Sequence, residues 1–280
     1  MHTSTLASLY SYPSRERDRF LYQMLGDPSH YVEWVEQFTS RTVSRLSWGS
    51  AHPAQVLRRT TFGLLETISP SGALPNILSF LRHVPGVISP WKRKEKARHE
   101  LENRLFKANL GFVEDMVARD KAEPSFIRTA LEDTGGSGSE EMDEATRVVG
   151  LMAIAGALTI GSPLQSYFLA MCHYPRWQRR LQDELDSVLG DGRCPQWEDR
   201  ERLPLLRAVV KEVIRWRPPV PTGIPHAVEK DDIYDGYLIP AGATIHALEW
   251  YVFGIFAPSC YSQQNFSFVS RGFFQLTREW

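Results

Sequence analysis

A glutamate and an arginine one helical turn apart are the residues in this sequence that most directly suggest chemistry. Glu212 and Arg215 are three positions apart, and residues at that spacing share one face of an α-helix. A carboxylate and a guanidinium on one face form a bidentate ion pair and can together hold a third polar group. Ordinary exposed ion pairs have the same spacing, so the flanking sequence must decide between the two interpretations.

Apolar residues surround the pair and predict a buried helix that ends abruptly. In a buried helix an unpaired charge is costly, so the two side chains are expected to bind each other. Pro218, Pro219 and Pro221 end the helix, because proline lacks the amide hydrogen and clashes with the preceding turn. The apolar residues of the helix are Leu205, Leu206, Val209, Val210, Val213 and Ile214.

Helical patterning dominates the remaining sequence. Apolar residues recur at helical spacing over 31–46, 94–117 and 176–188. The only convincing strands are short ones after Pro219, where Asp235-Gly236 and Ala241-Gly242 are typical of tight turns. The predicted dividers between helices are Asp27-Pro28-Ser29, Pro70-Ser71-Gly72 and the Gly-rich segment 135–139. The sequence therefore predicts a mainly α fold with a small β portion near the C-terminus.

The charge balance and the cysteines argue against several classes of function. With 32 basic and 33 acidic residues the net charge is -1, which gives no footprint for nucleic acid. Three unevenly spaced cysteines favour a reducing compartment over a disulfide framework. The sequence has no CxxC pair and no metal-spaced Cys/His cluster, and segment 135–139 lacks the lysine of a phosphate-binding loop. We therefore predict no nucleic-acid partner. We also assign no metal-ligating residue.

The residues after the Glu212 helix carry a resemblance to a known family. Glu212-x-x-Arg215 is followed by Trp-Arg-Pro-Pro at 216–219 and Gly-Ile-Pro-His at 223–226. Asp-Asp-x-Tyr-x-Gly-Tyr-x-Ile-Pro-x-Gly-Ala then occupies 231–243. These segments resemble the K helix and first sheet of a cytochrome P-450, a heme-thiolate monooxygenase, and are closest to fungal enzymes of secondary metabolism. The resemblance covers about residues 17–250 and implies a partial cytochrome P-450 fold, roughly the D to K helices plus the first sheet.

A second segment resembles the long I helix of that family. Residues 148–160 contain Ala155-Gly156 and Thr159, matching an Ala-Gly-x-acid-Thr motif that takes part in oxygen activation. The resemblance implies that Thr159 is a catalytic residue. Leu158 stands where the family has Asp or Glu, and leucine can neither carry nor accept a proton. Proton delivery in this chain is therefore expected to differ from that of the family.

The resemblance implies roles for further residues and a heme cofactor. Glu212 and Arg215 would hold the fold around the heme, and His226 would bind a heme propionate. Two alternatives stay open: the pocket positions belong to an ordinary apolar core, and His226 is an ordinary surface residue. The implied substrate-pocket residues are Leu151, Ala155, Val220 and Ile224.

The iron-binding motif of the family is missing from this sequence. Cytochromes P-450 bind iron through the cysteine of Phe-x-x-Gly-x-Arg-x-Cys-x-Gly, and no such segment occurs here. Cys172 and Cys194 both precede the Glu212 helix, which is the wrong place for the motif. Cys260 has Phe256 and Pro258 where the glycine and arginine should be. We therefore assign no axial heme ligand.

The last thirty or so residues differ in composition from the rest of the chain. Residues 251–280 carry nine aromatic and three charged side chains and do not follow the family. We predict a partial cytochrome P-450 domain at 1–250 and a divergent tail at 251–280. An unspliced intron, a shifted reading frame or a lineage-specific tail would each give such a change. With the N-terminal anchor and first helices of the family also missing, we expect truncation at both ends.

Two hypotheses about function are consistent with the sequence. The first is a heme-dependent monooxygenase that takes electrons from a reductase and acts on a lipophilic secondary metabolite in a fungal biosynthetic pathway. The second is a non-catalytic truncated remnant or pseudoenzyme that lacks the heme-ligating cysteine.

The membrane signals in the sequence are weak. Full-length relatives are anchored in the endoplasmic reticulum membrane, but the apolar run 148–160 is shorter than the roughly 18 residues that a spanning helix needs. We therefore predict no spanning segment and a soluble or peripheral chain. Segment 84–91, followed by the basic residues Lys92, Arg93, Lys94 and Lys96, fits either a membrane-surface contact or a solvated basic face.

Overall fold

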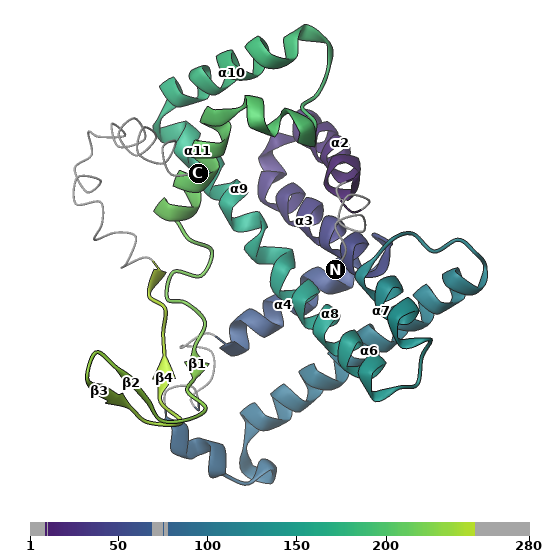
Figure 1. The fold of residues 1–280 in the computed structure, drawn as a ribbon, viewed down its shortest axis with the longest axis vertical. Helices are drawn as coiled ribbons and strands as arrows, with labels where there is room; N and C mark the ends of the chain where they lie inside the picture. Colours follow the sequence, from purple (N-terminus) through teal and green to yellow (C-terminus); the bar gives the residue numbers. More distant parts are fainter. Residues whose placement is uncertain (1–8, 10, 69–74, 76–77, 250–280) are drawn as a thin grey trace. The chain divides into compact units, whose positions relative to one another are not determined.

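In a computed structural model of the chain, the described residues are 9, 11–68, 75 and 78–249. They form a mainly α fold with four short strands, as the sequence predicted (Figure 1). The chain divides into two compact units, Met1–Gly161 and Ser162–Trp280. Pro70-Ser71-Gly72 and the predicted tail 251–280 lie outside the described residues.

The described part of the first unit consists of helices and the segments that connect them, without a strand. Its long helices agree with the predicted apolar stripes at 31–46 and 94–117, and Gly135 ends α7 in a left-handed conformation (φ 70°). The α-helices of this unit are α2 (Ser11–Gly26), α3 (Tyr31–Trp48), α4 (Ala54–Ile68), α6 (Pro90–Ala118), α7 (Phe126–Thr134) and α8 (Glu140–Thr159). Short 3₁₀ turns are η1 (Pro28–His30), η2 (Ser79–His83) and η3 (Gly86–Ile88).

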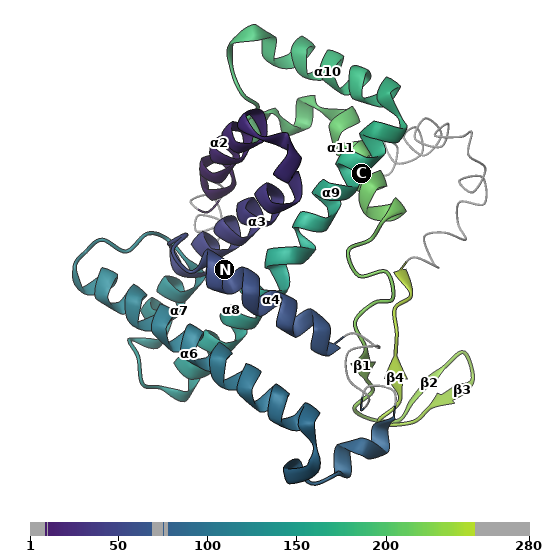
Figure 2. The same ribbon diagram turned by 180° about the vertical axis from the view of Figure 1, so that it is seen from behind.

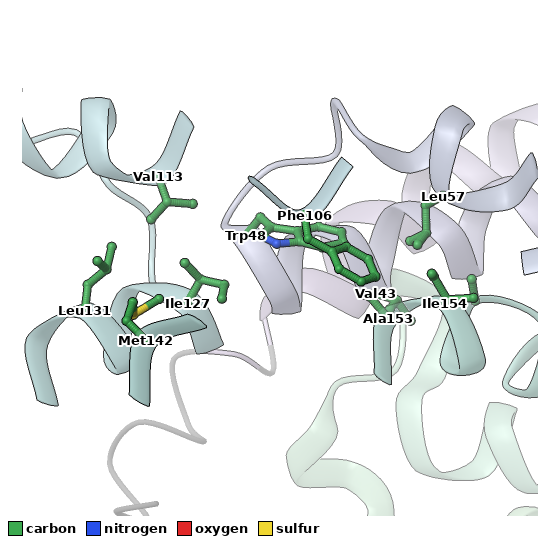
Figure 3. Packing of buried hydrophobic residues seen from close by; sticks show 11 residues of the cluster. Val43, Trp48, Leu57, Phe106, Val113, Ile127, Leu131, Met142, Ala153 and Ile154 are labelled. Carbon is green, nitrogen blue, oxygen red and sulfur yellow. The ribbon is translucent and has the colours of Figure 1, made fainter. Parts of the chain in front are cut away.

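Helix α8 is the central element of the first unit, since it packs against α3, α4, α6 and α7. One buried cluster joins these helices, and Figure 3 shows its side chains from close by. Gly150 of α8 allows the ring of Phe106 on α6 to lie directly against the helix backbone. The cluster consists of Val43, Trp48, Leu57, Phe106, Val113, Ile127, Leu131, Met142, Ala153, Ile154 and Ala157.

A buried carboxylate joins α2 to α3 beside this core. The side chain of Glu16 is 3% exposed and accepts hydrogen bonds from Arg41 Nε (2.5 Å) and Arg45 Nε (2.6 Å). Burial raises the pKa of Glu16, but the two arginine hydrogen bonds outweigh it and hold the pKa below its ordinary value. Glu16 is therefore charged at neutral pH.

The described part of the second unit, up to Glu249, combines three α-helices and two 3₁₀ turns with two small antiparallel ladders (Figure 2). In the ladders β1 pairs with β4, and β2 pairs with β3 through a turn at Asp235 (φ 51°) and Gly236 (φ 81°). This turn is where the sequence predicted it. The elements are α9 (Gly161–His173), α10 (Pro175–Leu189), η4 (Gly190–Gly192), η5 (Trp197–Arg202), α11 (Pro204–Trp216), β1 (His226–Ala227), β2 (Asp232–Tyr234), β3 (Tyr237–Ile239) and β4 (Thr244–Ile245).

The structure corrects the expectation that α11 is buried on all sides. Val209 and Val213 are buried in a cluster with Ala170 and Met171 of α9 and with α10. On the other side of α11, Val210 is 50% exposed and Ile214 is 40% exposed. Within the described residues, α11 thus packs on one face only, because its neighbours α9 and α10 meet the face that carries Val209 and Val213.

Candidate functional site

Glu212 and Arg215 form the ion pair that their spacing predicted. Arg215 donates from Nε to Glu212 Oε2 (2.7 Å) and from Nη2 to Glu212 Oε1 (2.6 Å). The side chains are 15% and 21% exposed respectively, so the pair is largely shielded from water. Such a bidentate, partly dry pair is rigid and holds its charges in fixed positions.

A glutamate from another helix holds the beginning of α11. The carboxylate of Glu184 on α10 accepts hydrogen bonds from the backbone amides of Leu205 (2.7 Å) and Leu206 (2.9 Å). Leu203, at the N-cap of α11, supplies no side-chain cap. Glu184 thus satisfies two amides that a helix start leaves free, and its charge suits the positive end of the helix dipole. It fixes α11, and with it the ion pair, against α10.

A small hollow adjoins the ion pair inside the second unit. Apart from Glu212 its lining is apolar and comes from α9 and α11, which indicates a packing gap more than a ligand pocket. The lining residues are Ala170, Met171, Val209, Glu212, Val213 and Trp216.

Thr159 is the last residue of α8. Its hydroxyl donates to the carbonyl oxygen of Ala155 (2.9 Å), one turn earlier in the same helix. The single hydroxyl hydrogen is thereby used, and the oxygen lone pairs remain able to accept a hydrogen bond. Thr159 therefore offers an acceptor at the end of α8.

The predicted pocket residues of α8 share a face with Thr159. Leu151, Ala155 and Thr159 follow at intervals of four, which places them along one side of the helix. Leu151 is 46% exposed and Ala155 is exposed, whereas Ala153, Ile154 and Ala157 on the other side are buried. The packing of the first unit thus leaves an apolar face of α8 uncovered.

The remaining predicted residues lie around β1 in the second unit. His226 is exposed and belongs to strand β1, where it pairs with Ile245. Ile224 is 52% exposed and Val220 is half-buried. Between them, Gly223 has a φ of 68°, and a Cβ there would collide with the backbone of Ala247. The absence of a side chain at Gly223 therefore allows the backbone that leads into β1 to pass close to Ala247.

The predicted site residues therefore form two groups. Leu151, Ala155 and Thr159 belong to the first unit, whereas the Glu212–Arg215 pair and the residues near β1 belong to the second. Sequence reasoning missed Glu184. It is one of several charged residues in the amphipathic helix α10, and its partners lie 21 and 22 positions away.

A heme requires an apolar surface for its ring and an axial ligand for its iron. The uncovered apolar face of α8 suits a flat apolar ring, and the Thr159 hydroxyl stands at its end. An axial ligand is not found in the described part: Cys172 and Cys194 are free and exposed, and no group of three or more His, Cys, Asp or Glu residues gathers there. Cys260 lies outside the described residues. This face of α8 fits an apolar ring such as that of heme, and the described residues assign no iron ligand.

Among the described residues, one helical run is long and apolar enough to cross a membrane by length and composition. It covers Glu140–His173, that is α8 and α9, and 29% of its most apolar window is buried. Core helices of soluble proteins pass the same test. This run is longer than the segment 148–160 considered from the sequence, but it is weak evidence for a span.

Comparison with known proteins identifies the class of fold. A zebra fish cytochrome P-450 solved with progesterone superposes with a TM-score of 0.73 at 21% identity, covering 92% of this chain and 60% of that one. The structure with abiraterone gives 0.69 at 20% identity, with the same coverage. The fold is thus that of the cytochromes P-450.

Sequence comparison extends this to the family. The cytochrome P-450 family model matches residues 23–253. A cytochrome P-450 monooxygenase of Armillaria gallica is 32% identical over 82% of this chain. One from Rhodocybe pseudopiperita is 33% identical over 83%. The chain belongs to the cytochrome P-450 family, and it spans 46% of the length of each of these two relatives.

Proposed function

We propose that the protein is a heme-dependent monooxygenase that acts on a lipophilic secondary metabolite in a fungal biosynthetic pathway. The observation that carries this proposal is the uncovered apolar face of α8 that ends at the Thr159 hydroxyl. In a member of the cytochrome P-450 family, that face supports a contact with heme and an apolar substrate. The bound heme supplies the oxygen-activating chemistry.

The roles proposed for this chain's own residues follow from their contacts. Leu151 and Ala155 hold an apolar substrate by excluding water from their face of α8. The Thr159 oxygen accepts a hydrogen bond, because its own hydrogen is held by Ala155. Leu158, the next residue back, has no group that carries a proton, so proton delivery must come from water or another side chain. Glu212 and Arg215 keep the second unit rigid, and a reductase supplies the electrons.

The alternative proposal is that the chain is a non-catalytic remnant of such an enzyme. It is favoured by the absence of the heme-thiolate cysteine motif from the sequence and by the exposure of both described cysteines. A chain of this kind would fold, or be recognised by a partner, without binding heme.

An absorption spectrum of the purified full chain separates the two functions. The chain is produced with added hemin, reduced and exposed to carbon monoxide, beside Cys172→Ser, Cys194→Ser and Cys260→Ser variants. A red-shifted Soret band that one of these variants abolishes supports the monooxygenase and names the sulfur ligand. A wild-type chain that retains no heme supports the remnant.

We also propose that the chain is soluble or attached peripherally to a membrane. Phe80, Val87 and Ile88 are 65%, 85% and 68% exposed, and the basic residues Lys92 and Arg93 follow within the next few positions after Ile88. Apolar side chains beside cations suit an anionic lipid surface. Sedimentation with anionic vesicles should pull down the wild type more than a Val87→Asp variant, and equal sedimentation of the two would contradict peripheral attachment through this segment.

A further inference from the structure

We propose that Thr39, on α3, is a positioning residue for Thr159. Its hydroxyl holds a backbone carbonyl at the place where the helix containing Thr159 is interrupted. The functional meaning of this inference rests on the proposed function, because it concerns the segment that would present Thr159 to oxygen. The structural contact itself is independent of heme.

A proline explains why the helix breaks at Thr159. Helix α8 ends at Thr159, α9 begins at Gly161, and Ile160 forms the turn between them. Pro163 is four residues after Thr159, so it has no amide hydrogen for the Thr159 carbonyl, and its ring crowds that carbonyl. The amide of Ile160 still reaches the carbonyl of Gly156, at 3.3 Å. The helical ladder is therefore weakened from Thr159 onward.

Thr39 contacts the chain on the buried side of this break. Its Oγ1 donates to the carbonyl oxygen of Ala157 at 2.7 Å, across 118 positions of sequence. Carbonyl oxygens of its own helix, at Val35 and Glu36, are further away at 3.1 and 3.3 Å. Because the hydroxyl has one hydrogen, the shortest contact is the favoured one. Thr39 is 1% exposed and Ala157 is fully buried, so water does not compete for this bond.

The backbone at Gly161, the last residue of the first unit, also comes close to α3. A Cβ on Gly161 would lie 3.3 Å from Thr39 Oγ1 and 3.3 Å from Val35 Cγ1. Only a residue without a side chain fits this gap without displacing its neighbours. Thr39 therefore binds Ala157, before Thr159 in sequence, and lies close to Gly161, after it. This arrangement fixes the course of the backbone through Thr159.

The test compares hydrogen exchange in wild type, Thr39→Val, Thr39→Ser and Thr42→Val, all as the full chain. Thr42 is the matched control, since it is also buried on α3 and donates at 2.8 Å to Phe38 of its own helix. In Thr39→Val the amides of residues 156–161 should exchange about tenfold faster, because one buried hydrogen bond is lost. Thr39→Ser should restore slow exchange, and Thr42→Val should leave these amides unchanged.

Unchanged exchange at 156–161 in Thr39→Val, or equal acceleration in Thr42→Val, would overturn the proposal. A second variant, Pro163→Ala, covers the case in which Thr39→Val does not fold. It returns an amide hydrogen to the Thr159 carbonyl, so exchange at residues 160–162 and 164 should slow, and adding Thr39→Ser should leave it slow. Exchange at 160–162 and 164 as fast as in wild type would contradict the role of the break.

These outcomes are independent of the proposed function. Hydrogen exchange is measured without heme, so a chain that binds no heme can still confirm the contact between Thr39 and the break. Conversely, a chain can show the expected carbon monoxide spectrum while hydrogen exchange at residues 156–161 is unchanged by Thr39→Val. That result would refute the positioning role alone. The two proposals therefore fail separately.

Discussion

At the scale of single residues, charged groups in this protein are kept in place by specific partners. Glu16, Glu184 and Glu212 are each bound through both carboxylate oxygens, to two arginines, two backbone amides and one guanidinium respectively. A shielded carboxylate needs such partners, because an unpaired charge away from water is strongly unfavourable. These contacts of Glu16 and Glu212 lead to two predictions.

The first prediction concerns the acid stability of the first unit. The folded-state pKa of Glu16 lies below its ordinary value of 4.5, so its stabilising effect is complete above that pH. The effect is lost as the pH falls below 4.5 and through the lower folded pKa, because the folded state then takes up a proton less readily than the unfolded state. Wild type should lose stability over this range in urea denaturation, whereas Glu16→Gln should show a flatter pH dependence.

The control for Glu16 is Asp18→Asn on the same helix. Asp18 is 67% exposed and pairs at the surface with Arg17, so its removal should change stability little. At pH 7, Glu16→Gln should cost about 2–3 kcal/mol, less than for a fully buried pair because Arg41 and Arg45 are partly exposed. Equal behaviour of the two variants would show that the Glu16 pair is energetically unimportant.

The second prediction concerns the ion pair of α11. Glu212→Gln removes the charge that holds Arg215 and should lower the free energy of unfolding by about 1–2 kcal/mol, since the pair is shielded but not fully buried. Lys211→Gln, at an exposed position of the same helix, should stay within about 0.5 kcal/mol of wild type. Chemical denaturation of both variants measures the difference. A Glu212→Gln chain as stable as Lys211→Gln would argue against a structural role of the pair.

At the scale of elements, two glycines in long helices give opposite expectations for the same substitution. A Cβ on Gly150 would enter the ring of Phe106, which is 3% exposed in the core, so Gly150→Ala should destabilise the chain by about 1–3 kcal/mol. Gly111 on α6 has nothing within 4 Å of such a Cβ. Gly111→Ala should therefore stabilise by up to about 1 kcal/mol through helix propensity.

Thermal unfolding of the two alanine variants checks this pair. Their melting temperatures should move in opposite directions from wild type. A higher melting temperature for Gly150→Ala would mean that Phe106 can move aside without loss, contrary to the close packing of the core.

Elements also show how far the sequence alone could predict the structure. The apolar stripes gave α3, α6 and α10, and the Asp235-Gly236 pair gave the turn of the β2–β3 hairpin, because these signals are local. The contacts of Thr39 with Ala157 and of Glu184 with Leu205 were missed, since they join residues 118 and 21 positions apart. No local pattern marks such partners, and only the folded chain brings them together.

The site was predictable to the same extent. The spacing of Glu212 and Arg215 gave their ion pair, and the periodicity of α8 gave the face shared by Leu151, Ala155 and Thr159. The exposure of Val210 and Ile214 was not predictable, because an apolar stripe shows which residues can be buried and not which neighbours cover them. The roles of Thr159 and His226 toward a heme stay predictions.

At the scale of the whole molecule, charge and exposed apolar area together set the colloidal behaviour. The net charge is -1 at pH 7 and the isoelectric point is about 6.7, so electrostatic repulsion between molecules is weak near neutrality. Several large apolar side chains are exposed among the described residues, including Tyr22 (81%), Leu25 (87%) and Val87 (85%). Self-association is therefore expected to be strongest near neutral pH.

Light scattering of the full chain between pH 5.5 and 8.5 tests this last prediction. The isoelectric point of about 6.7 lies inside this range, so the net charge is positive at lower pH and negative at higher pH. Scattering should therefore peak near pH 6.7 and decrease on both sides. A Leu25→Lys variant adds a cation and removes an exposed apolar side chain, so its maximum should be lower and shifted to higher pH. A maximum that keeps its pH in this variant would show that net charge does not govern the association.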